Sequence, residues 1–493
     1  MFWIELYLIF QMSLWFVTRL RLGFSSGENS ALAVLLGLGI KSFLLFIFVV
    51  LTLKNFIVSP AIFSILVFFF YVIWIKFFPL SFDDSLLGKP PKDKLYKFFG
   101  FWILLVLSIF SLLNAWFFPI TSADGIWHHV KGMVYSFPLI DFESNQIISQ
   151  FKQYPPLIGF IYGWLISANL ERLPILFPAL YVCLLFIFFH KNFEHIKDIK
   201  VAGLGTLVLG TTPYLWWHSF LPFLDWTAGV FYAVGILYWF SLIKNILEPT
   251  VGIKTKQNKS LALLSGLFFG FASWTRPEFF LYSTLPLFLL VCAFDRHEEF
   301  SSEREPVILR FGVAAFILPS LWFFILLTFD SPLHSIFKQL IMGCAASWIG
   351  LGLVSFRLVR FSPRVSVLIG IFSVFICLSG LFIIPNSDFS LWTTLTVRFF
   401  RLFAVQIFFV GTIFLFVFVF VEKLGKLPLA EKNLGTLLLL FLLTQFFVYA
   451  YSGLKWPTLS QYIDNTFIHP GNSINLSDTR GTMAIYPAFI FFF

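Results

Sequence analysis

The chain has 493 residues, of which 59% are hydrophobic and only 12% are charged, and its formal net charge is +9. Soluble domains carry about 25% charged residues, so this composition excludes a soluble enzyme, a disordered chain and a fibrous repeat. Phenylalanine alone contributes 71 residues, and long apolar runs recur along the whole chain. These runs are continuous rather than alternating, which favours spanning helices over a β-barrel. The sequence therefore predicts an all-α polytopic membrane protein.

The apolar runs predict a bundle of about 13–14 transmembrane helices, since each run is close to the length that crosses a bilayer. In chain order, the runs lie near residues 2–18, 30–53, 56–75, 98–118, 173–190, 201–218, 226–243, 261–275, 279–294, 311–329, 340–356, 365–384, 402–421 and 434–451. The stretch 155–170 is apolar but shorter and begins with two prolines. We expect an interfacial or re-entrant helix there instead of a span.

Two long loops organise the predicted bundle. Residues 1–97 form the N-terminal spans, residues 98–300 form a core that carries the loop 119–172, and residues 301–493 form the C-terminal spans with the loop 452–482. Both loops are predicted to lie on the same side of the membrane, the first as a helical loop close to the bilayer surface.

The lysines and arginines predict which side that is. Most of them gather in alternate loops, such as Lys89–Lys97, Lys191–Lys200 and Lys254–Lys259, and Arg19, Arg21 and Lys41 are assigned to the same side. Cytoplasmic loops are enriched in basic residues, so this side is predicted to be cytoplasmic. The dispersal over short loops excludes a nucleic-acid partner. The protein is then a multi-pass protein of the cytoplasmic (inner) membrane, with both long loops in the periplasm or exterior.

The first outer loop carries an amphipathic helical pattern. Asp124, Trp127, His128, Lys131 and Tyr135 recur at helical spacing and share one face, which is typical of a helix lying at a membrane surface. The helix N-terminus stabilises an anion, so Asp124 should stay ionised and be able to accept a proton from a hydroxyl. His128 or His129 could orient Asp124, share its proton or ligate a metal, and Lys131 could counter a phosphate. An ordinary surface helix with interfacial Trp and His remains the alternative.

Further candidate residues lie on the same predicted side, beside the ends of spans. They are Tyr154, which precedes two prolines, Asp225, Arg276, Glu278 and Arg480. Ionisable groups beside hydrocarbon are costly and are functional candidates by default. The planar guanidinium of Arg276 suits an oxyanion such as a phosphate. A structural interaction between Arg276 and Glu278 is the alternative.

The order of these features resembles the GT-C class of polytopic glycosyltransferases, which includes protein O-mannosyltransferases and aminoarabinose transferases of lipid A. Asp124 matches the acidic residue of their first outer loop, and Tyr154–Leu157 is similar to the Tyr/His-Pro-Pro-Leu segment that ends this loop. Asp225 matches an Asp that opens a later span, and residues 266–278 resemble a G-x-x-x-G-x-A-x-x-T-K/R-x-E span. The resemblance covers about residues 98–300, and the Arg480 region weakly.

The resemblance implies a membrane glycosyltransferase. Such an enzyme moves a hexosyl or pentosyl group, with inversion, from a polyprenyl-phosphate-linked donor to an envelope lipid, glycan or protein. Asp124 would act as the base, and Lys131, Arg276 and Arg480 would hold the donor phosphate. Many relatives have paired acids in the first loop, whereas Gly125 follows Asp124 here. The metal ligands therefore stay unknown, a divalent metal stays open, and no other cofactor is predicted.

Two other classes remain open. A glycan polymerase or ligase of another fold also uses lipid-linked substrates, and it carries essential Arg and His residues in a later outer loop. The predicted outer loop 452–482 of this chain contains His469 and Arg480, which keeps this class open. A lipid or sugar transporter would show internal repeats and charges within its spans. The sequence shows no clear repeat, and its charges are expected to gather at one membrane face.

Overall fold

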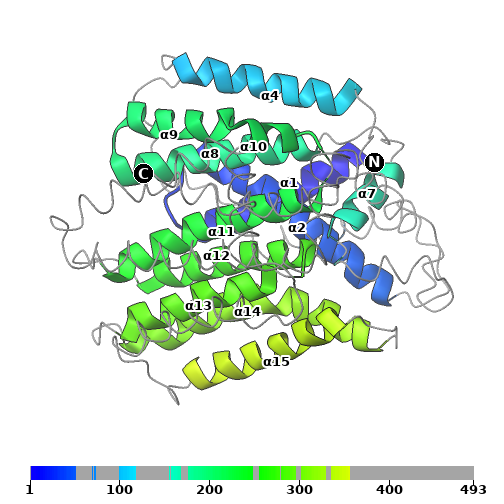
Figure 1. Ribbon diagram of the computed structural model, residues 1–493, viewed down its shortest axis with the longest axis vertical. Helices are drawn as coiled ribbons and strands as arrows, with labels where there is room; N and C mark the ends of the chain where they lie inside the picture. The colour runs from blue at the N-terminus through cyan, green and yellow to red at the C-terminus, as the bar shows by residue number, and fades with distance from the viewer. Residues whose placement is uncertain are drawn as a thin grey trace, which may run out of the picture.

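The computed structural model describes residues 2–51, 69, 72–73, 99–117, 155, 157–167, 176–221, 223–247, 255–277, 279–295, 301–328 and 335–355. Within these ranges every regular element is a helix (Figure 1). The helices are α1 (Phe2–Arg19), α2 (Ser26–Leu51), α4 (Phe99–Phe117), α7 (Leu157–Ser167), α8 (Leu176–Ile196), α9 (Ile199–Thr211), α10 (Pro213–His218), α11 (Leu224–Leu247), α12 (Thr255–Thr275), α13 (Phe279–Asp295), α14 (Ser301–Thr328) and α15 (Ser335–Ser355). The predicted all-α class is confirmed for this part of the chain.

Five of the described helices are long and apolar enough to cross a membrane, judged by length and composition. They are α2, α4, α8, α11 and α14. This supports a membrane protein, while the membrane and its orientation stay predictions. The predicted spans at 365–384, 402–421 and 434–451 lie outside the described residues, as does most of 56–75.

The predicted span at 201–218 is wrong as a single helix. The structure ends α9 at Thr211 and begins α10 at Pro213. Pro213 has no backbone N–H to donate, and its ring disfavours a helical conformation in the residue before it. Thr212 accordingly adopts φ −59° and ψ 115°. The apolar pattern predicts 201–218 as one run, whereas Pro213 is the signal that a helix ends before it.

A short helix occurs at the predicted place, but not on a surface. All side chains of α7 described between Leu157 and Leu165 are buried, and α7 packs beside α2. The helix is apolar on every side, so it has no polar face to offer to water. The interfacial alternative is therefore wrong, and α7 is an interior element of the bundle.

Polar contacts show which helix ends lie together at one end of the bundle. The start of α2 meets the end of α8 and the last turns of α11 through Glu28, Lys191 and Tyr238. The last turn of α11 meets α12, and α12 meets α14, through Asn258 and Glu303. We call this the basic end, because Lys191–Lys200 and Lys254–Lys259 belong to it in the sequence.

The opposite ends of the same helices also gather. Ser111 near the end of α4 bonds to Ser219, which follows α10, at 2.6 Å between hydroxyl oxygens. Asp225 at the start of α11 meets Arg276 just after α12. We call this the Arg276 end. The separation of the two ends agrees with the predicted grouping of loops into two sets. Lys41 is an exception to this grouping. Lys41 lies inside α2 and is buried, so its assignment to a cytoplasmic loop is wrong.

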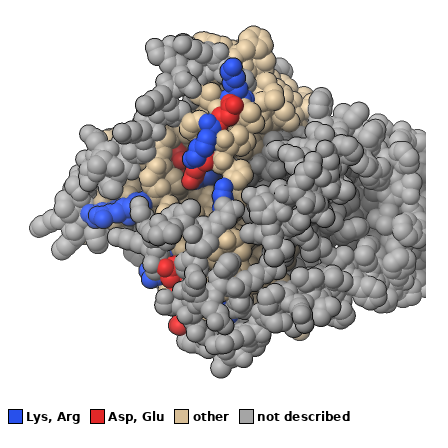
Figure 2. Space-filling view, turned by 90° about the vertical axis from the view of Figure 1, so that its left-hand side faces the viewer, with Lys and Arg blue, Asp and Glu red and all other residues tan. Residues whose placement is uncertain are grey.

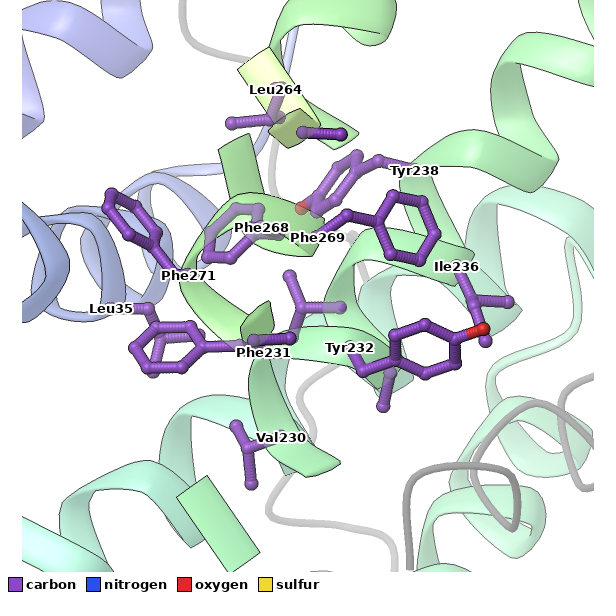
Figure 3. Packing of buried hydrophobic residues seen from close by; sticks show 14 of the residues in the cluster. Leu35, Val230, Phe231, Tyr232, Ile236, Tyr238, Leu264, Phe268, Phe269 and Phe271 are labelled. Carbon is purple, nitrogen blue, oxygen red and sulfur yellow. The ribbon is translucent and has the colours of Figure 1, made fainter. Parts of the chain in front are cut away.

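Aromatic side chains of α11 and α12 fill the centre of the bundle (Figure 3). The ring of Phe231 lies 6.2 Å from that of Phe268 and 5.6 Å from that of Phe271, measured between centroids. The ring of Tyr232 lies 5.0 Å from that of Phe269 in an edge-to-face arrangement. Such geometry adds to the free energy gained from burial. The two helices therefore form a rigid support for whatever lies at their shared Arg276 end.

Glycines bring α12 and α14 into backbone contact. A Cβ atom at Gly266 would lie 2.5 Å from the carbonyl oxygen of Phe311, and one at Gly270 would lie 2.6 Å from that of Ala314. Small residues four apart permit such close helix packing. The two glycines in the segment that resembles a GT-C span therefore have a packing role here.

One hydrophobic cluster includes residues from all three predicted segments, whose boundaries at residues 97 and 300 stay predictions.

Candidate functional site

An ion pair lies at the Arg276 end, where α11 begins and α12 ends. The Nη1 atom of Arg276 contacts the Oδ1 atom of Asp225, and these side chains are 19% and 9% exposed. Asp225 lies in the first turn of α11, where the helix dipole favours a negative charge. Arg276 follows the last residue of α12, where the dipole favours a positive charge. Both helix ends therefore stabilise the charges that they carry.

The turn between α12 and α13 fixes the backbone of Arg276. Its N–H donates to the carbonyl of Ala272 at 2.9 Å, and its own carbonyl accepts from the N–H of Phe279 at 3.2 Å. Pro277 lies in this turn and cannot continue the hydrogen-bond ladder of α12. The N–H of Phe280 then donates to the Pro277 carbonyl at 3.1 Å. The guanidinium is thus presented from a hydrogen-bonded turn.

Buried tryptophans flank both charged residues in the sequence. Trp226, next to Asp225, is 1% exposed, and Trp274, two residues before Arg276, is fully buried. The indole N–H of Trp274 donates to Ser42 Oγ at 3.3 Å. Burial beside these rings lowers the local dielectric and strengthens the attraction between the two charges. The partial exposure of Arg276 still leaves its guanidinium accessible to an anion.

Two of the predicted site residues are thus brought together, Asp225 and Arg276. The remaining ones, Asp124, His128, Lys131, Tyr154, Glu278 and Arg480, lie outside the described residues, and their roles stay predictions. The same holds for His469, for the loop 452–482, and for the loop 119–172 apart from residue 155 and α7. The partner found for Arg276 is Asp225, which the sequence did not indicate.

A second buried charge pair consists of residues that are not among the predicted site residues. Lys41 Nζ of α2 contacts Glu5 Oε1 of α1, and the two side chains are 1% and 3% exposed. The indole N–H of Trp164 in α7 donates to Glu5 Oε2 at 3.1 Å. Lys41 Nζ also lies 4.6 Å from the centroid of the Trp164 ring. The sequence signal for this pair is that Glu5 and Lys41 each lie as a charge inside an apolar run, where a charge is costly.

A third buried pair lies at the basic end. Lys191 Nζ is 3.2 Å from Glu28 Oε1 and 2.7 Å from Glu194 Oε2. The hydroxyl of Tyr238 donates to Glu28 Oε1 at 2.7 Å. The expectation that charges gather at one membrane face is therefore wrong, because buried charges are placed wherever an opposite charge on a neighbouring helix compensates them. Figure 2, which shows the left-hand side of Figure 1, likewise has acidic and basic side chains interleaved.

The arrangement suits an anion better than a cation. Among the residues that the structure describes, no group of three or more His, Cys, Asp or Glu side chains could hold a metal ion. The Arg276 guanidinium offers several N–H donors in one plane, which match the oxygens of a phosphate. The Asp225 carboxylate occupies part of this donor set.

Comparison with known proteins adds no relative. No protein-family model matches the chain, and neither a curated protein nor a solved structure is detectably similar to it. The class that the fold defines is an all-helical protein with helices able to span a membrane. The finer assignment to a glycosyltransferase class therefore depends on the site and on the sequence resemblance, and it is a proposal.

Proposed function

We propose that the protein is an integral-membrane glycosyltransferase of the GT-C type. It moves a sugar from a polyprenyl-phosphate donor to a lipid, glycan or protein acceptor at the outer face of the cytoplasmic membrane. The observation that carries this proposal is the ion pair between Asp225 and Arg276 at one end of the apolar bundle. In this proposal the Arg276 end of the bundle lies at the headgroup level, so that the guanidinium can meet the phosphate of a membrane-bound donor.

A polyprenyl-phosphate sugar makes two opposite demands on its enzyme. Its isoprenoid tail stays in hydrocarbon, whereas its phosphate needs cationic donors at the headgroup level. Arg276 meets the second demand, since it lies at a helix end, is partly exposed and is held in place by Asp225. In the absence of donor, Asp225 offsets the cost of keeping this guanidinium half-buried. Donor phosphate would then compete with Asp225 for the guanidinium.

The proposed reaction is a single displacement. Asp124 removes the proton from the acceptor hydroxyl, whose oxygen attacks the anomeric carbon, and the bond from this carbon to the phosphate oxygen breaks. Phosphate leaves with the electron pair, and the configuration at the anomeric carbon inverts. His128 orients Asp124, Lys131, Arg276 and Arg480 neutralise the charge on the leaving phosphate, and Tyr154 and Glu278 line the substrate site.

The general test uses vesicles that contain the purified protein. They are supplied with polyprenyl-phosphate sugars that carry a radiolabel in the sugar and with envelope lipid, glycan and protein as acceptors, and the label is followed into each of these fractions. Transfer to any acceptor supports the proposal, and retention of all label on polyprenyl phosphate contradicts it. A transporter, which the intramembrane pair of Glu5 and Lys41 also suits, would carry the donor across the bilayer with its sugar–phosphate bond intact.

The role of Arg276 has a sharper test. Replacing both partners, in Asp225→Asn with Arg276→Gln, removes the cation without leaving an unpaired buried carboxylate. We expect the KM for the donor to rise roughly 10- to 100-fold, because hydrogen bonds to charged groups contribute about 1.5–3 kcal/mol. Donor titrations of the vesicle assay measure this. An unchanged donor KM would make Arg276 a structural residue.

A further inference from the structure

One short stretch of α2 contacts three other helices. Its Lys41 side chain meets Glu5 of α1 and Trp164 of α7. The next residue, Ser42, accepts the hydrogen bond from Trp274 of α12 at 3.3 Å. These contacts tie α1, α7 and α12 to the same place on α2.

Aromatic packing reinforces the same junction. The ring of Phe46, one turn further along α2, lies 4.7 Å from the ring of Trp274 and 6.3 Å from that of Phe160 in α7. Trp274 also packs edge-on against Phe43 at 6.2 Å. Trp274 therefore contacts α2 through its indole N–H and through two ring–ring contacts, and it also packs on Trp322 of α14 at 6.4 Å.

The register of α2 against α12 is restricted in a further way. A Cβ atom at Gly39 would lie 2.5 Å from the ring of Phe271, so the two helices touch at this level. Trp274 and Arg276 follow Phe271 within the last turn of α12 and the turn after it. A shift of α2 along α12 would therefore displace the indole ring of Trp274, which lies two residues before Arg276.

The pair of Lys41 and Glu5 is suited to fix this register. Both groups are buried, so a displacement of α2 by one turn, about 5.4 Å, would separate them and leave two uncompensated charges. Breaking a buried pair is strongly unfavourable, and the best-attested benefit of such groups is the selection of one register. An apolar contact at this position would tolerate sliding far better.

We infer that Lys41 is a positioning residue for Arg276. The ion pair with Glu5 sets the register of α2, and Ser42 transmits it to the end of α12 through the indole N–H of Trp274. The inference rests on the proposed function, because it assigns to this junction the placement of the guanidinium that binds the donor phosphate. Lys41 itself does not contact the donor.

The basic end supplies a matched control. Glu28 and Lys191 form an equally buried ion pair, which joins α2 to α8. Neutralising this pair also removes one carboxylate and one ammonium, but here α2 supplies the carboxylate, and the pair lies at the end far from Arg276. A general loss of helix packing would affect both pairs alike, whereas positioning of Arg276 depends on the Lys41 pair alone.

The kinetic test compares variants on equal amounts of folded protein, as judged by gel filtration in detergent. For Ser42→Ala, and for Glu5→Gln with Lys41→Met, we expect the donor KM to rise roughly 5- to 20-fold with kcat within about twofold, because the guanidinium is displaced from the phosphate. The charge-swapped pair, Glu5→Lys with Lys41→Glu, should recover most of the loss. Glu28→Gln with Lys191→Met should change neither constant. A fall in kcat at constant KM, or an equal rise in KM in the control, would overturn the inference.

A second measurement does not depend on activity. Asp225→Cys and Arg276→Cys are introduced after the four native cysteines have been replaced by alanine, and a short bifunctional thiosulfonate joins the new thiols. We expect the cross-linked fraction to fall at least threefold with Ser42→Ala or with the neutralised Lys41 pair, and to stay constant with the neutralised Lys191 pair. Constant cross-linking throughout would refute positioning. Absence of sugar transfer by the unmodified protein, with a responsive cross-link, would refute the proposed function alone.

Discussion

Replacing Asp124 by asparagine is expected to lower sugar transfer by roughly 10²- to 10⁴-fold, the usual contribution of a general base. The amide has nearly the shape of the carboxylate but cannot take a proton from the acceptor hydroxyl. Loss of one negative charge from the first turn of the predicted helix costs only about 0.3–1 kcal/mol. The protein should therefore still insert into the membrane, fold, and bind its donor with an unchanged KM.

The measurement is the initial rate of label transfer at saturating donor, normalised to the amount of folded protein. Asp141→Asn is the matched control, since it makes the same chemical change in the same predicted loop and should leave the rate within about twofold, as surface substitutions usually do. Near-normal transfer by the Asp124 variant would remove Asp124 as the base. An equal loss in both variants would point to the loop as a whole instead of one carboxylate.

Much of the helical architecture follows from hydropathy alone. The runs at 226–243 and 279–294 predict α11 and α13, and the structure extends the first to Leu224–Leu247 and the second by one residue, to Asp295. In hydrocarbon every backbone N–H and C=O group needs a partner within the protein, and a continuous apolar run meets this need by forming a helix. The break at Pro213 shows the limit, since a proline ends a helix within a stretch that the apolar pattern predicts as one span.

The candidate site was harder to predict than the fold. Asp225 and Arg276 each stand out as charges beside apolar runs, but their pairing depends on how α11 and α12 align side by side, which the sequence does not state. Lys41 shows the opposite error, since a lysine suggests a cytoplasmic loop only when no partner compensates it. Its partner Glu5 lies on another helix. A charge inside a span therefore predicts that a counter-charge exists, but not where.

The last prediction concerns the contact between α12 and α14, on which the placement of Arg276 also depends. Gly266→Ala with Gly270→Ala is expected to lower the stability of the folded protein by about 2–6 kcal/mol, the sum of two overpacked sites. Each new methyl group meets a backbone carbonyl oxygen, of Phe311 at 2.5 Å and of Ala314 at 2.6 Å. A side chain could rotate away from such an overlap, but a helix backbone yields only when the whole of α14 moves.

Thermal unfolding in detergent measures this effect, and α15 provides the control. Gly350 and Gly352 also lie within a helix, but a Cβ atom at either position would meet nothing within 4 Å. Alanine there should be neutral or stabilising by up to about 1 kcal/mol each, from its higher helix propensity. Equal behaviour of the two glycine pairs would show that α12 and α14 do not pack through their backbones. If they do, residual transfer in the Gly266 and Gly270 variant should fall in proportion to the folded fraction, whereas the Ser42→Ala variant should stay folded and lose donor affinity.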